Sequence, residues 1–463
     1  MKNLSGGSNR QSTGWPRGGV GVSTSSQTIS PDTDMANAQR LIAQHGDDLR
    51  FCYDWAKWLV WTGIRWKVDN TGALFRRAKE TVASIYSEGL HEWARKSESL
   101  VRIKAMISLA ESEVAVTPGE LDVDGWLLNV RNGTINLRTG ELRPHNRDDL
   151  ITIVAPVEFD SAAPCHLWEA FLTRIFRRDP SLARYVQRSL GYALTGDVRE
   201  QVIFFLCGPG ANGKTTLQNV MLGILGDYAK SSAPGLLLHS NHDRHPTEIA
   251  DLKGARFVAS AEIGEGKTLR EELVKRLTGS DRLKGRFMRQ DFWEFDPTHK
   301  IFVACNHMPN VRGADHAIWR RMKVIPFAVH IPEKEQDKEL TAKLLAERSG
   351  ILNWLIDGAQ RWDRRGLREP KAIRTVTEEY RLGEDVLGQF LADCCVQGLR
   401  LNVKKGELYG AYCDWCRGHG EDTFSQRELS KRLQERGFRG KKSGAKSEHH
   451  WFGLTLRDNG DIG

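Results

Sequence analysis

Several features that mark other classes of protein are missing from this 463-residue chain. No apolar run approaches the roughly 18 residues that a membrane-spanning helix requires, and the longest run near the centre, residues 202–207, suits a strand. The amino terminus lacks the apolar stretch of a secretory signal. Cysteine is scarce, at eight residues, which favours reduced thiols over a disulfide framework. We therefore expect a cytoplasmic protein that does not enter a membrane.

The composition itself is ordinary for a globular protein, with 40% hydrophobic and 27% charged residues. Lys and Arg number 67 against 59 Asp and Glu, and the resulting charge of +8 gives a mild preference for polyanions. The length corresponds to about three domains. Residues 1–35 are rich in Gly, Ser, Thr and Asn and predict a flexible tail, because they bury too little apolar surface to offset the entropy of ordering.

Three folded segments are expected after the tail. The first, residues 36–162, is mainly helical with hairpin signals, and its residues 74–113 read as one long helical stretch. Four tryptophans between residues 55 and 66 favour a small aromatic core over a base-stacking surface. Residues 163–384 alternate strand-like and helical runs, which is typical of an α/β domain with a largely parallel sheet. Residues 385–463 are basic and predict a separate small domain.

The clearest chemical motif is the phosphate-binding loop G-x-x-x-x-G-K-[ST] at residues 208–215. Its glycines let successive backbone N–H groups point inward at phosphates. Lys214 is expected to reach the β- and γ-phosphates of ATP, while the Thr215 hydroxyl coordinates Mg²⁺. An apolar strand leads in and a helix leads out, as the motif requires. The predicted nucleotide-binding residues are Gly208, Pro209, Gly210, Ala211, Asn212, Gly213, Lys214, Thr215 and Thr216.

Polar residues follow two later strands of the same segment. Glu262 ends an apolar strand and is expected to hold the hydrated Mg²⁺ and to activate water, either alone or together with Glu265. Asn306 ends another apolar strand and is expected to orient the attacking water. A pair of arginines comes next, which suits a finger that stabilises the phosphoryl group in a neighbouring subunit. We predict Arg321 for this finger, with Arg320 assisting it or pairing with an acid of its own subunit.

With these elements in order, the chain resembles the superfamily 3 helicase domain of phage and plasmid primase–helicases, a group related to the poxvirus uncoating ATPase/primase. The resemblance covers about residues 40–460, and its matching stretches include residues 133–142, 190–196, 225–229, 275–281, 305–309 and 319–327. It implies a P-loop core of the AAA+ type between a mainly helical N-terminal domain and a C-terminal winged-helix domain. It further implies a homo-oligomeric ring, usually a hexamer, that hydrolyses ATP and moves 3′→5′ on single-stranded DNA.

Two departures from the family pattern bear on function. Many relatives carry a polymerase-like primase module before the helicase, whereas only about 35 residues precede the helical region here, too few for a catalytic domain. We therefore expect no priming activity in this chain, with a separate primase as a candidate partner. The second departure is Ser280, which stands between Gly279 and Asp281 where relatives have a second glycine, and we expect this change to be tolerated.

The first basic cluster suited to DNA lies just before the strand that ends at Asn306. The alternating pattern on both sides of residues 289–291 predicts a hairpin. The resemblance places such a hairpin in the central channel of the ring. Arg289 is expected near its tip, with Lys284 and Arg286 on its flank. These residues would make sequence-independent, salt-sensitive contacts with phosphates.

The second basic cluster lies near the carboxyl terminus. Ser425 and Glu428 form a capping box that predicts a helix over residues 426–436, after an earlier helix near residues 407–416. A basic, Gly-rich loop between strands follows, and this order of elements indicates a winged helix. Residues 423–450 hold eight Lys and Arg against three Asp and Glu. The residues expected to contact duplex DNA are Arg427, Lys431, Arg432, Lys441 and Lys442.

The leading functional prediction is an ATP-driven replicative DNA helicase of a phage, prophage or plasmid-like element, with single- and double-stranded DNA as its partners. One alternative is a P-loop ATPase that remodels protein or packages DNA. Another is an origin-binding protein that uses its P-loop only to switch oligomeric state. Stimulation of ATP hydrolysis by single-stranded DNA, together with unwinding of a forked duplex, would separate the first function from the other two.

Overall fold

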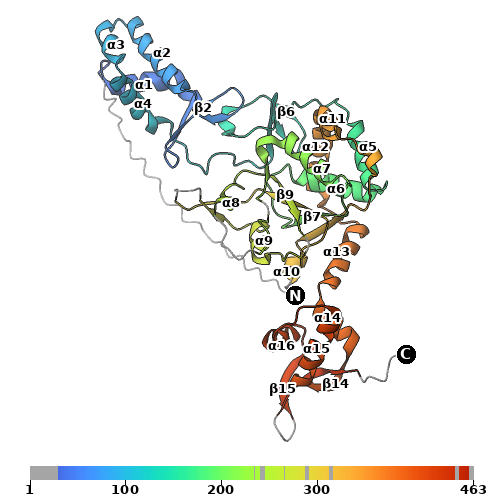
Figure 1. Ribbon diagram of the computed structural model, residues 1–463. Coiled ribbons are helices and arrows are strands. Elements are labelled where there is room, and N and C mark those ends of the chain that lie inside the picture. Colours follow the sequence, from blue (N-terminus) through green and yellow to red (C-terminus); the bar gives the residue numbers. More distant parts are fainter. Residues whose placement is uncertain are drawn as a thin grey trace, which may run out of the picture. The chain divides into compact units, whose positions relative to one another are not determined.

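The computed structural model describes residues 30–233, 235–239, 246–264, 266–286, 291–311, 316–443 and 448–457 (Figure 1). Its contacts divide the chain into two compact units, one of Met1–Phe51 with Asp69–Ala115 and the other of Cys52–Val68 with Val116–Gly463. The finer division expected from composition stays a prediction, and most of the predicted tail lies outside the described residues. Among the described helices, none has the length and hydropathy of a membrane span.

Four helices make up most of the first unit. They are α1 (Asp34–His45), α2 (Ala73–Ser87), α3 (His91–Ser97) and α4 (Leu100–Ala110), and the short strand β1 (Leu49–Cys52) follows α1. The single helical stretch expected over residues 74–113 is therefore wrong in detail. Gly89 takes a left-handed φ of 80° after α2, and the Ser99 hydroxyl accepts from the N–H of Arg102 to start α4. The helices bury a core that includes Leu41, Ala78, Ile85 and Met106.

Two small antiparallel sheets open the second unit. One contains the hairpin of β2 (Lys57–Trp61) and β3 (Trp66–Val68), and the other is formed by β4 (Leu127–Val130), β5 (Gly133–Asn136) and β6 (Leu142–Arg143). The hairpins that the turn signals predict are confirmed. Of the four clustered tryptophans, Trp66 is fully buried, whereas Trp55 keeps 37% of its surface exposed. The aromatic-core interpretation therefore holds for Trp66 but not for Trp55.

The centre of the second unit is a five-stranded parallel sheet with the strand order β13-β7-β12-β9-β8 (Figure 1). Its strands are β7 (Ile203–Cys207), β8 (Ala229–Ser231), β9 (Phe257–Ile263), β12 (Lys300–Cys305) and β13 (Met322–Pro326). The predicted mixed α/β fold with a largely parallel sheet is confirmed. Because all five strands run the same way, their carboxyl ends share one edge of the sheet.

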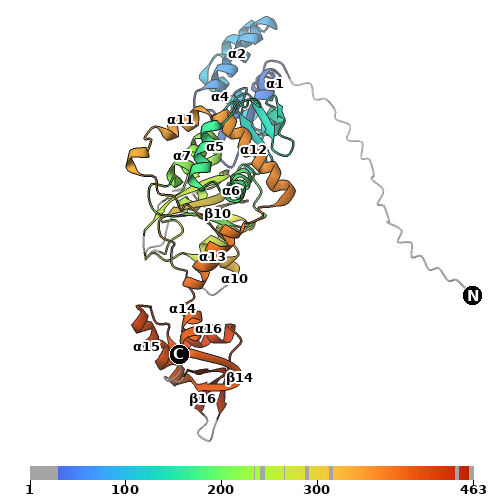
Figure 2. The ribbon, with the colours of Figure 1, turned by 90° about the vertical axis from the view of Figure 1, so that its right-hand side faces the viewer.

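Both faces of this sheet are covered, because side chains alternate along each strand. Along β7, Phe204 and Leu206 join one core, while Ile203 and Phe205 join another. The first core is built with α5 (His166–Ile175), α6 (Pro180–Tyr192), α7 (Lys214–Leu225), α11 (Leu340–Ala346) and α12 (Arg348–Arg365), which Figure 2 shows together. The second core is built with α8 (Thr247–Ala250), α9 (Glu271–Leu277), α10 (His316–Trp319) and α13 (Lys371–Gly383).

Two buried cations, which the sequence did not predict, lie at the opposite edge of the sheet, where the strands begin. Lys300, the first residue of β12, donates to the Thr298 carbonyl at 2.9 Å and to the Thr195 carbonyl. Arg256, just before β9, donates to the carbonyls of Leu194 at 2.7 Å and Leu127 at 2.8 Å. Burial lowers the pKa of both side chains. Carbonyl acceptors satisfy both cations, which tie flanking segments to the sheet.

The remaining strands form two further antiparallel sheets. β10 (Leu283–Gly285) pairs with β11 (Trp293–Phe295), where the sequence predicts a hairpin. The C-terminal elements are α14 (Val386–Cys394), β14 (Cys395–Lys404), α15 (Lys405–His419), α16 (Gln426–Glu435), β15 (Arg439–Ser443) and β16 (Glu448–Leu456), with the strand order β14-β16-β15. The Ser425 side chain accepts from the Glu428 N–H, so the predicted cap and helix are confirmed. The winged-helix assignment itself stays a prediction.

Candidate functional site

The phosphate loop connects β7 to α7, which is the strand–loop–helix setting that the sequence predicts. Two of its glycines stand where no side chain fits. A Cβ atom on Gly208 would lie 2.1 Å from the carbonyl oxygen of Phe327. A Cβ atom on Gly213, whose φ is 90°, would lie 2.9 Å from Cε2 of Phe171. The backbone of the loop is therefore packed closely against the protein at both of its ends.

Lys214 begins α7 and is only 6% exposed. Its Nζ donates to the Gly208 carbonyl at 2.6 Å and to Oδ1 of Asn306 at 2.9 Å. Asn306 directly follows β12, the strand beside β7. Two predicted site residues that are 92 positions apart in the sequence thus meet at one edge of the sheet. The next helical residue, Thr215, is exposed at this edge.

The predicted carboxylate lies on a neighbouring strand. Glu262 is near the end of β9, which pairs with β12. Because the strands are parallel, this end of β9 lies at the edge that also carries the phosphate loop. The side chain of Glu262 lies outside the described part of the structure, and Glu265 lies outside it altogether. Their roles in holding Mg²⁺ and activating water stay predictions.

A segment that the sequence analysis missed supports the loop from outside. After β13, the Phe327 N–H donates to the Cys207 carbonyl at 2.7 Å, and the Ile331 N–H donates to the Ala211 carbonyl at 2.8 Å. The Asn212 side chain reaches back to the Phe327 carbonyl at 3.0 Å. The bonds of the Phe327 and Ile331 N–H groups join backbone to backbone, so no residue-type signal in the sequence could have indicated them.

Two cysteines beneath the loop were also missed. Cys207 ends β7 and lies opposite Cys305, which ends β12. A hydrogen bond with the Cys305 thiol, aided by the positive charge of Lys214 and opposed by burial, lowers the pKa of Cys207 to about 7. Cys305 also lies 3.6 Å from Sδ of Met308. The site therefore has a thiol that ionises more readily than an ordinary cysteine.

The two arginines predicted for the finger differ sharply in exposure. Arg321 is 9% exposed, and its guanidinium donates to the Ala317 carbonyl at 2.7 Å and to the Thr278 hydroxyl at 3.2 Å. Arg320 is exposed, and its guanidinium lies 3.3 Å from the amide oxygen of Gln201. The finger role of either residue stays a prediction. A residue that acts on a neighbouring subunit must be accessible, so the geometry favours Arg320 over our first choice, Arg321.

The β10–β11 hairpin presents part of the first predicted DNA surface. Lys284 lies opposite Glu294 in the register and is exposed, and Arg286 follows β10 and is half-buried. Phe292, just before β11, keeps 47% of its surface exposed. Arg289, which the sequence places near the tip, lies outside the described residues.

The predicted basic residues of the C-terminal elements divide into two groups. Arg427, Lys431, Lys441 and Lys442 are exposed. Arg432 is 15% exposed, because its guanidinium donates to Glu428 at 3.0 Å and lies 4.0 Å from the centre of the Phe424 ring. Contacts with Glu428 and Phe424 therefore occupy Arg432, whereas the other four are accessible to phosphates.

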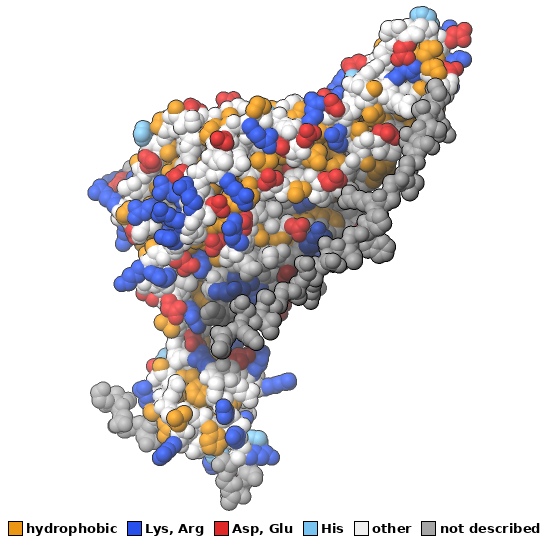
Figure 3. Space-filling model, turned by 180° about the vertical axis from the view of Figure 1, so that it is seen from behind, with side chains coloured by type: hydrophobic (Ala, Val, Ile, Leu, Met, Phe, Trp, Pro, Cys, Tyr) orange, Lys and Arg blue, Asp and Glu red, His pale blue; other side chains and the backbone are white. Residues whose placement is uncertain are grey.

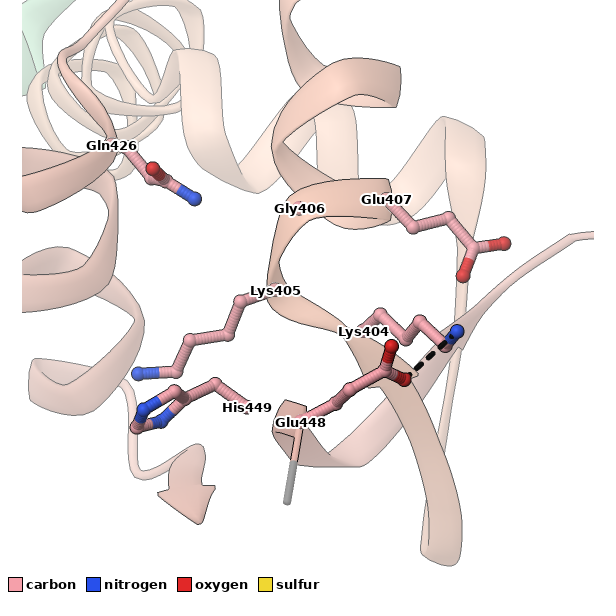
Figure 4. A pocket seen from close by; sticks show the side chains of 7 residues that line it. All are labelled: Lys404, Lys405, Gly406, Glu407, Gln426, Glu448 and His449. Carbon is pink, nitrogen blue, oxygen red and sulfur yellow. Dashed lines mark ion pairs between the residues drawn. The ribbon is translucent and has the colours of Figure 1, made fainter. Parts of the chain in front are cut away.

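A cavity of about 520 Å³ opens in the same region (Figure 4). It is lined by Lys404, Lys405, Gly406, Glu407, Gln426, Glu448 and His449. Lys404 forms an ion pair with Glu448 at 2.9 Å, and Nζ of Lys405 lies 4.5 Å from the centre of the Trp451 ring. Two glutamates offset the two lysines, so the cavity lacks the positive charge that would mark an anion site.

Basic side chains also gather away from the predicted sites. Figure 3 shows groups of Lys and Arg on one face of the molecule, with Asp and Glu between them. Among the residues that the structure describes, Arg188 lies in a basic environment, since its pKa is lowered by burial and by the nearby charges of Arg184, Arg361 and Arg368. The sequence analysis did not single out this group, because its members are far apart along the chain.

Comparisons with known proteins match most of the chain. A family described as D5 N terminal like matches residues 38–177, and a family of unknown function, DUF5906, matches residues 206–321. A protein of Acanthamoeba polyphaga mimivirus named as a helicase is 28% identical over 334 residues, which are 66% of this chain and 34% of that protein. A protein of African swine fever virus named as a primase is 23% identical over 322 residues, 64% of this chain and 34% of that protein. The chain thus spans about a third of the length of these relatives.

A solved structure supplies a match in fold. The apo structure of the NrS-1 C-terminal region aligns with a TM-score of 0.53 and 12% sequence identity, covering 91% of this chain and 99% of that one. At this identity the match establishes a common fold. Together, the family match over residues 38–177, the viral relatives and this common fold support the similarity of the chain to the primase–helicase family.

Proposed function

We propose that this chain is an ATP-dependent DNA helicase that works as a homo-oligomeric ring, a hexamer by family resemblance, and moves 3′→5′ on single-stranded DNA. The contact between Lys214 and Asn306 is the observation that carries the proposal. It joins the cation expected to meet the phosphates with the amide expected to orient the attacking water, at the edge where strands and a helix N-terminus converge.

The residues of the site support binding of ATP with Mg²⁺. A side chain at Gly208 or Gly213 would clash with Phe327 or Phe171, and this close packing supports the curled loop in which main-chain N–H groups approach phosphates. The exposed Thr215 hydroxyl and the Glu262 carboxylate are oxygen ligands of the kind that Mg²⁺ prefers, Glu262 acting through water. The bound Mg²⁺ would neutralise charge on the phosphates.

The remaining roles are divided among this chain's own residues. Lys214 stabilises the β- and γ-phosphates, Asn306 orients the attacking water, and Glu262 accepts a proton from it. Arg320 of a neighbouring subunit stabilises charge on the transferring phosphoryl group, because its guanidinium is accessible whereas that of Arg321 is not. A ring is needed for this last step.

The DNA contacts are divided between two surfaces. The β10–β11 hairpin, with Lys284 and Arg286, binds the backbone of the translocated strand. The C-terminal elements form a winged helix whose exposed Arg427, Lys431, Lys441 and Lys442 bind duplex phosphates and deliver the ring to its site of action.

The direct test is unwinding of forked DNA by the purified chain. We expect ATP-dependent separation of a fork whose single-stranded tail lets the ring enter in the 3′→5′ direction, and less separation when only the opposite tail is present. The Lys214→Ala variant is the matched control and should leave the fork intact. ATP hydrolysis without strand separation on either fork would favour the remodelling or origin-binding alternative instead.

A further inference from the structure

The two faces of the β10–β11 hairpin have different characters. Side chains alternate along a strand, so Leu283 and Phe295, which are opposite each other in the register, share one face and are buried. Lys284 and Glu294 share the other face and are exposed. The same alternation assigns Phe292, two residues before Glu294, to the outer face, where its ring is 47% exposed.

The inner face of the hairpin packs against aromatic and basic side chains. The Trp293 ring lies 5.1 Å from the Phe295 ring, and Nζ of Lys253 lies 5.0 Å from the centre of Trp293 and 5.1 Å from the centre of Trp55. Burial lowers the pKa of Lys253. An ammonium between two tryptophans stabilises the inner face by cation–π contact. The packing of the inner face therefore holds the hairpin in place, with its outer face exposed.

Two cations flank the exposed ring. Nζ of Lys284 lies 5.3 Å from the centre of the Phe292 ring, and the Arg286 guanidinium carbon lies 4.6 Å from it. The Phe292 ring is too exposed to gain much from burial, and both positive charges lie over it. Exposed aromatic rings among cations are the means by which proteins bind single-stranded nucleic acid without sequence preference.

We propose that Phe292 is a base-stacking residue: a base of single-stranded DNA stacks on its ring while Lys284 and Arg286 bind the adjoining phosphates. The proposal rests on the proposed helicase function and adds to it a contact with bases rather than with the backbone alone. In this proposal the hairpin binds one nucleotide through the π-face of its base. Because every base has such a face, the binding is independent of sequence.

The test distinguishes contacts with the bases from contacts with the phosphates. The affinity of the full chain is measured by fluorescence anisotropy for two labelled oligonucleotides of equal length, oligo-dT and an abasic strand with the same phosphates. Phe292→Ala should weaken oligo-dT binding by about fivefold to a hundredfold and leave abasic binding unchanged. Phe292→Trp should restore oligo-dT binding, and Phe292→Leu should not. Arg286→Ala should weaken binding of both strands.

Phe75→Ala is the matched control, since Phe75 is an aromatic residue of the first unit that is 40% exposed. It should leave both affinities unchanged. Wild-type affinity of Phe292→Ala for oligo-dT, or an equal loss on the abasic strand, would overturn the stacking role while leaving the helicase proposal standing. If the wild-type chain binds neither strand, the proposed helicase function fails, and the stacking proposal fails with it.

Discussion

The phosphate loop and the β10–β11 hairpin belong to the same unit but are built in opposite ways. In the loop, Lys214 is 6% exposed and its ammonium is held by carbonyl and amide oxygens. In the hairpin, Lys284 is exposed and Phe292 keeps 47% of its surface open. A buried cation that is held by hydrogen bonds is preorganised for one small ligand. Exposed cations suit a nucleic acid strand that slides along the protein. Substitutions in the loop should therefore abolish function, and those in the hairpin should weaken it by degrees.

The largest effect is expected from Lys214→Ala. ATP hydrolysis should fall by about a thousandfold, because this substitution removes the cation that meets the phosphates. The fold should survive, because the described hydrogen bonds of the ammonium are made to oxygens of the loop and of Asn306, and a melting temperature within about 4 °C of wild type is expected. Undiminished turnover together with a wild-type melting curve would refute the assignment of the loop.

The next largest effects distinguish the two arginines. Arg320→Ala should lower ATP hydrolysis at least about a hundredfold with no change in stability, because its guanidinium is exposed. Arg321→Ala should instead lower the free energy of unfolding by about 1–3 kcal/mol, because it removes a buried group bonded to Ala317 and Thr278. Thermal or urea unfolding of both variants, together with their ATPase rates, measures this difference.

Mixed rings show whether Arg320 acts across a subunit boundary. Arg320→Ala and Lys214→Ala subunits, each inactive alone, should regain some ATP hydrolysis when combined, because some junctions then contain both groups intact. Activity should peak at intermediate mixing ratios. If no mixture exceeds its inactive parents, the action on a neighbouring subunit is wrong.

A graded effect is expected from the C-terminal surface. The double substitution of Lys441 and Lys442 by Ala should weaken duplex binding and reduce the slope of log K against log salt by about 0.9 for each lost phosphate contact. Arg184 and Arg361, from the basic group around Arg188, supply the matched control double substitution. Equal changes of slope in both double variants would mean that general basicity, and not this surface, determines duplex binding.

The smallest effect concerns the thiol beneath the loop. Because the pKa of Cys207 is lowered to about 7 from the ordinary 9, its alkylation by iodoacetamide should rise with pH through about 7 and then level off, as the thiolate becomes complete. Cys394, whose pKa is raised by burial, should still be gaining reactivity above pH 8. Mass spectrometry of alkylated peptides measures both profiles. A Cys207 profile that follows that of Cys394 would contradict the contact with Cys305 and Lys214.

Sequence reasoning succeeded where the chemistry is local. The phosphate loop, the cap at Ser425 and the hairpin turns each depend on a few adjacent residues, and the structure contains all three elements. It missed the bonds of Phe327 and Ile331 to the loop and the carbonyl acceptors of Arg256 and Lys300, because backbone groups have no residue-type signature.

The burial of Arg321 is a second feature that the sequence alone could not predict. Adjacent arginines look alike in a sequence, and only the packing of α9 and α10 decides which of them stays accessible. The pairing of Lys214 with Asn306 is the favourable case. Each lies at the end of an apolar strand or loop that the sequence reveals, and a parallel sheet brings such ends to one edge.

The central claim is that the site at Lys214 and Asn306 hydrolyses ATP in response to DNA. The most direct measurement is the steady-state rate of ATP hydrolysis as single-stranded DNA is titrated into the wild-type chain and the Asn306→Ala variant. The account predicts a saturable rise in rate for the wild type, and for Asn306→Ala a rate that stays near background although the nucleotide still binds. A wild-type rate that is indifferent to single-stranded DNA, or an Asn306→Ala variant that responds as the wild type does, would contradict it.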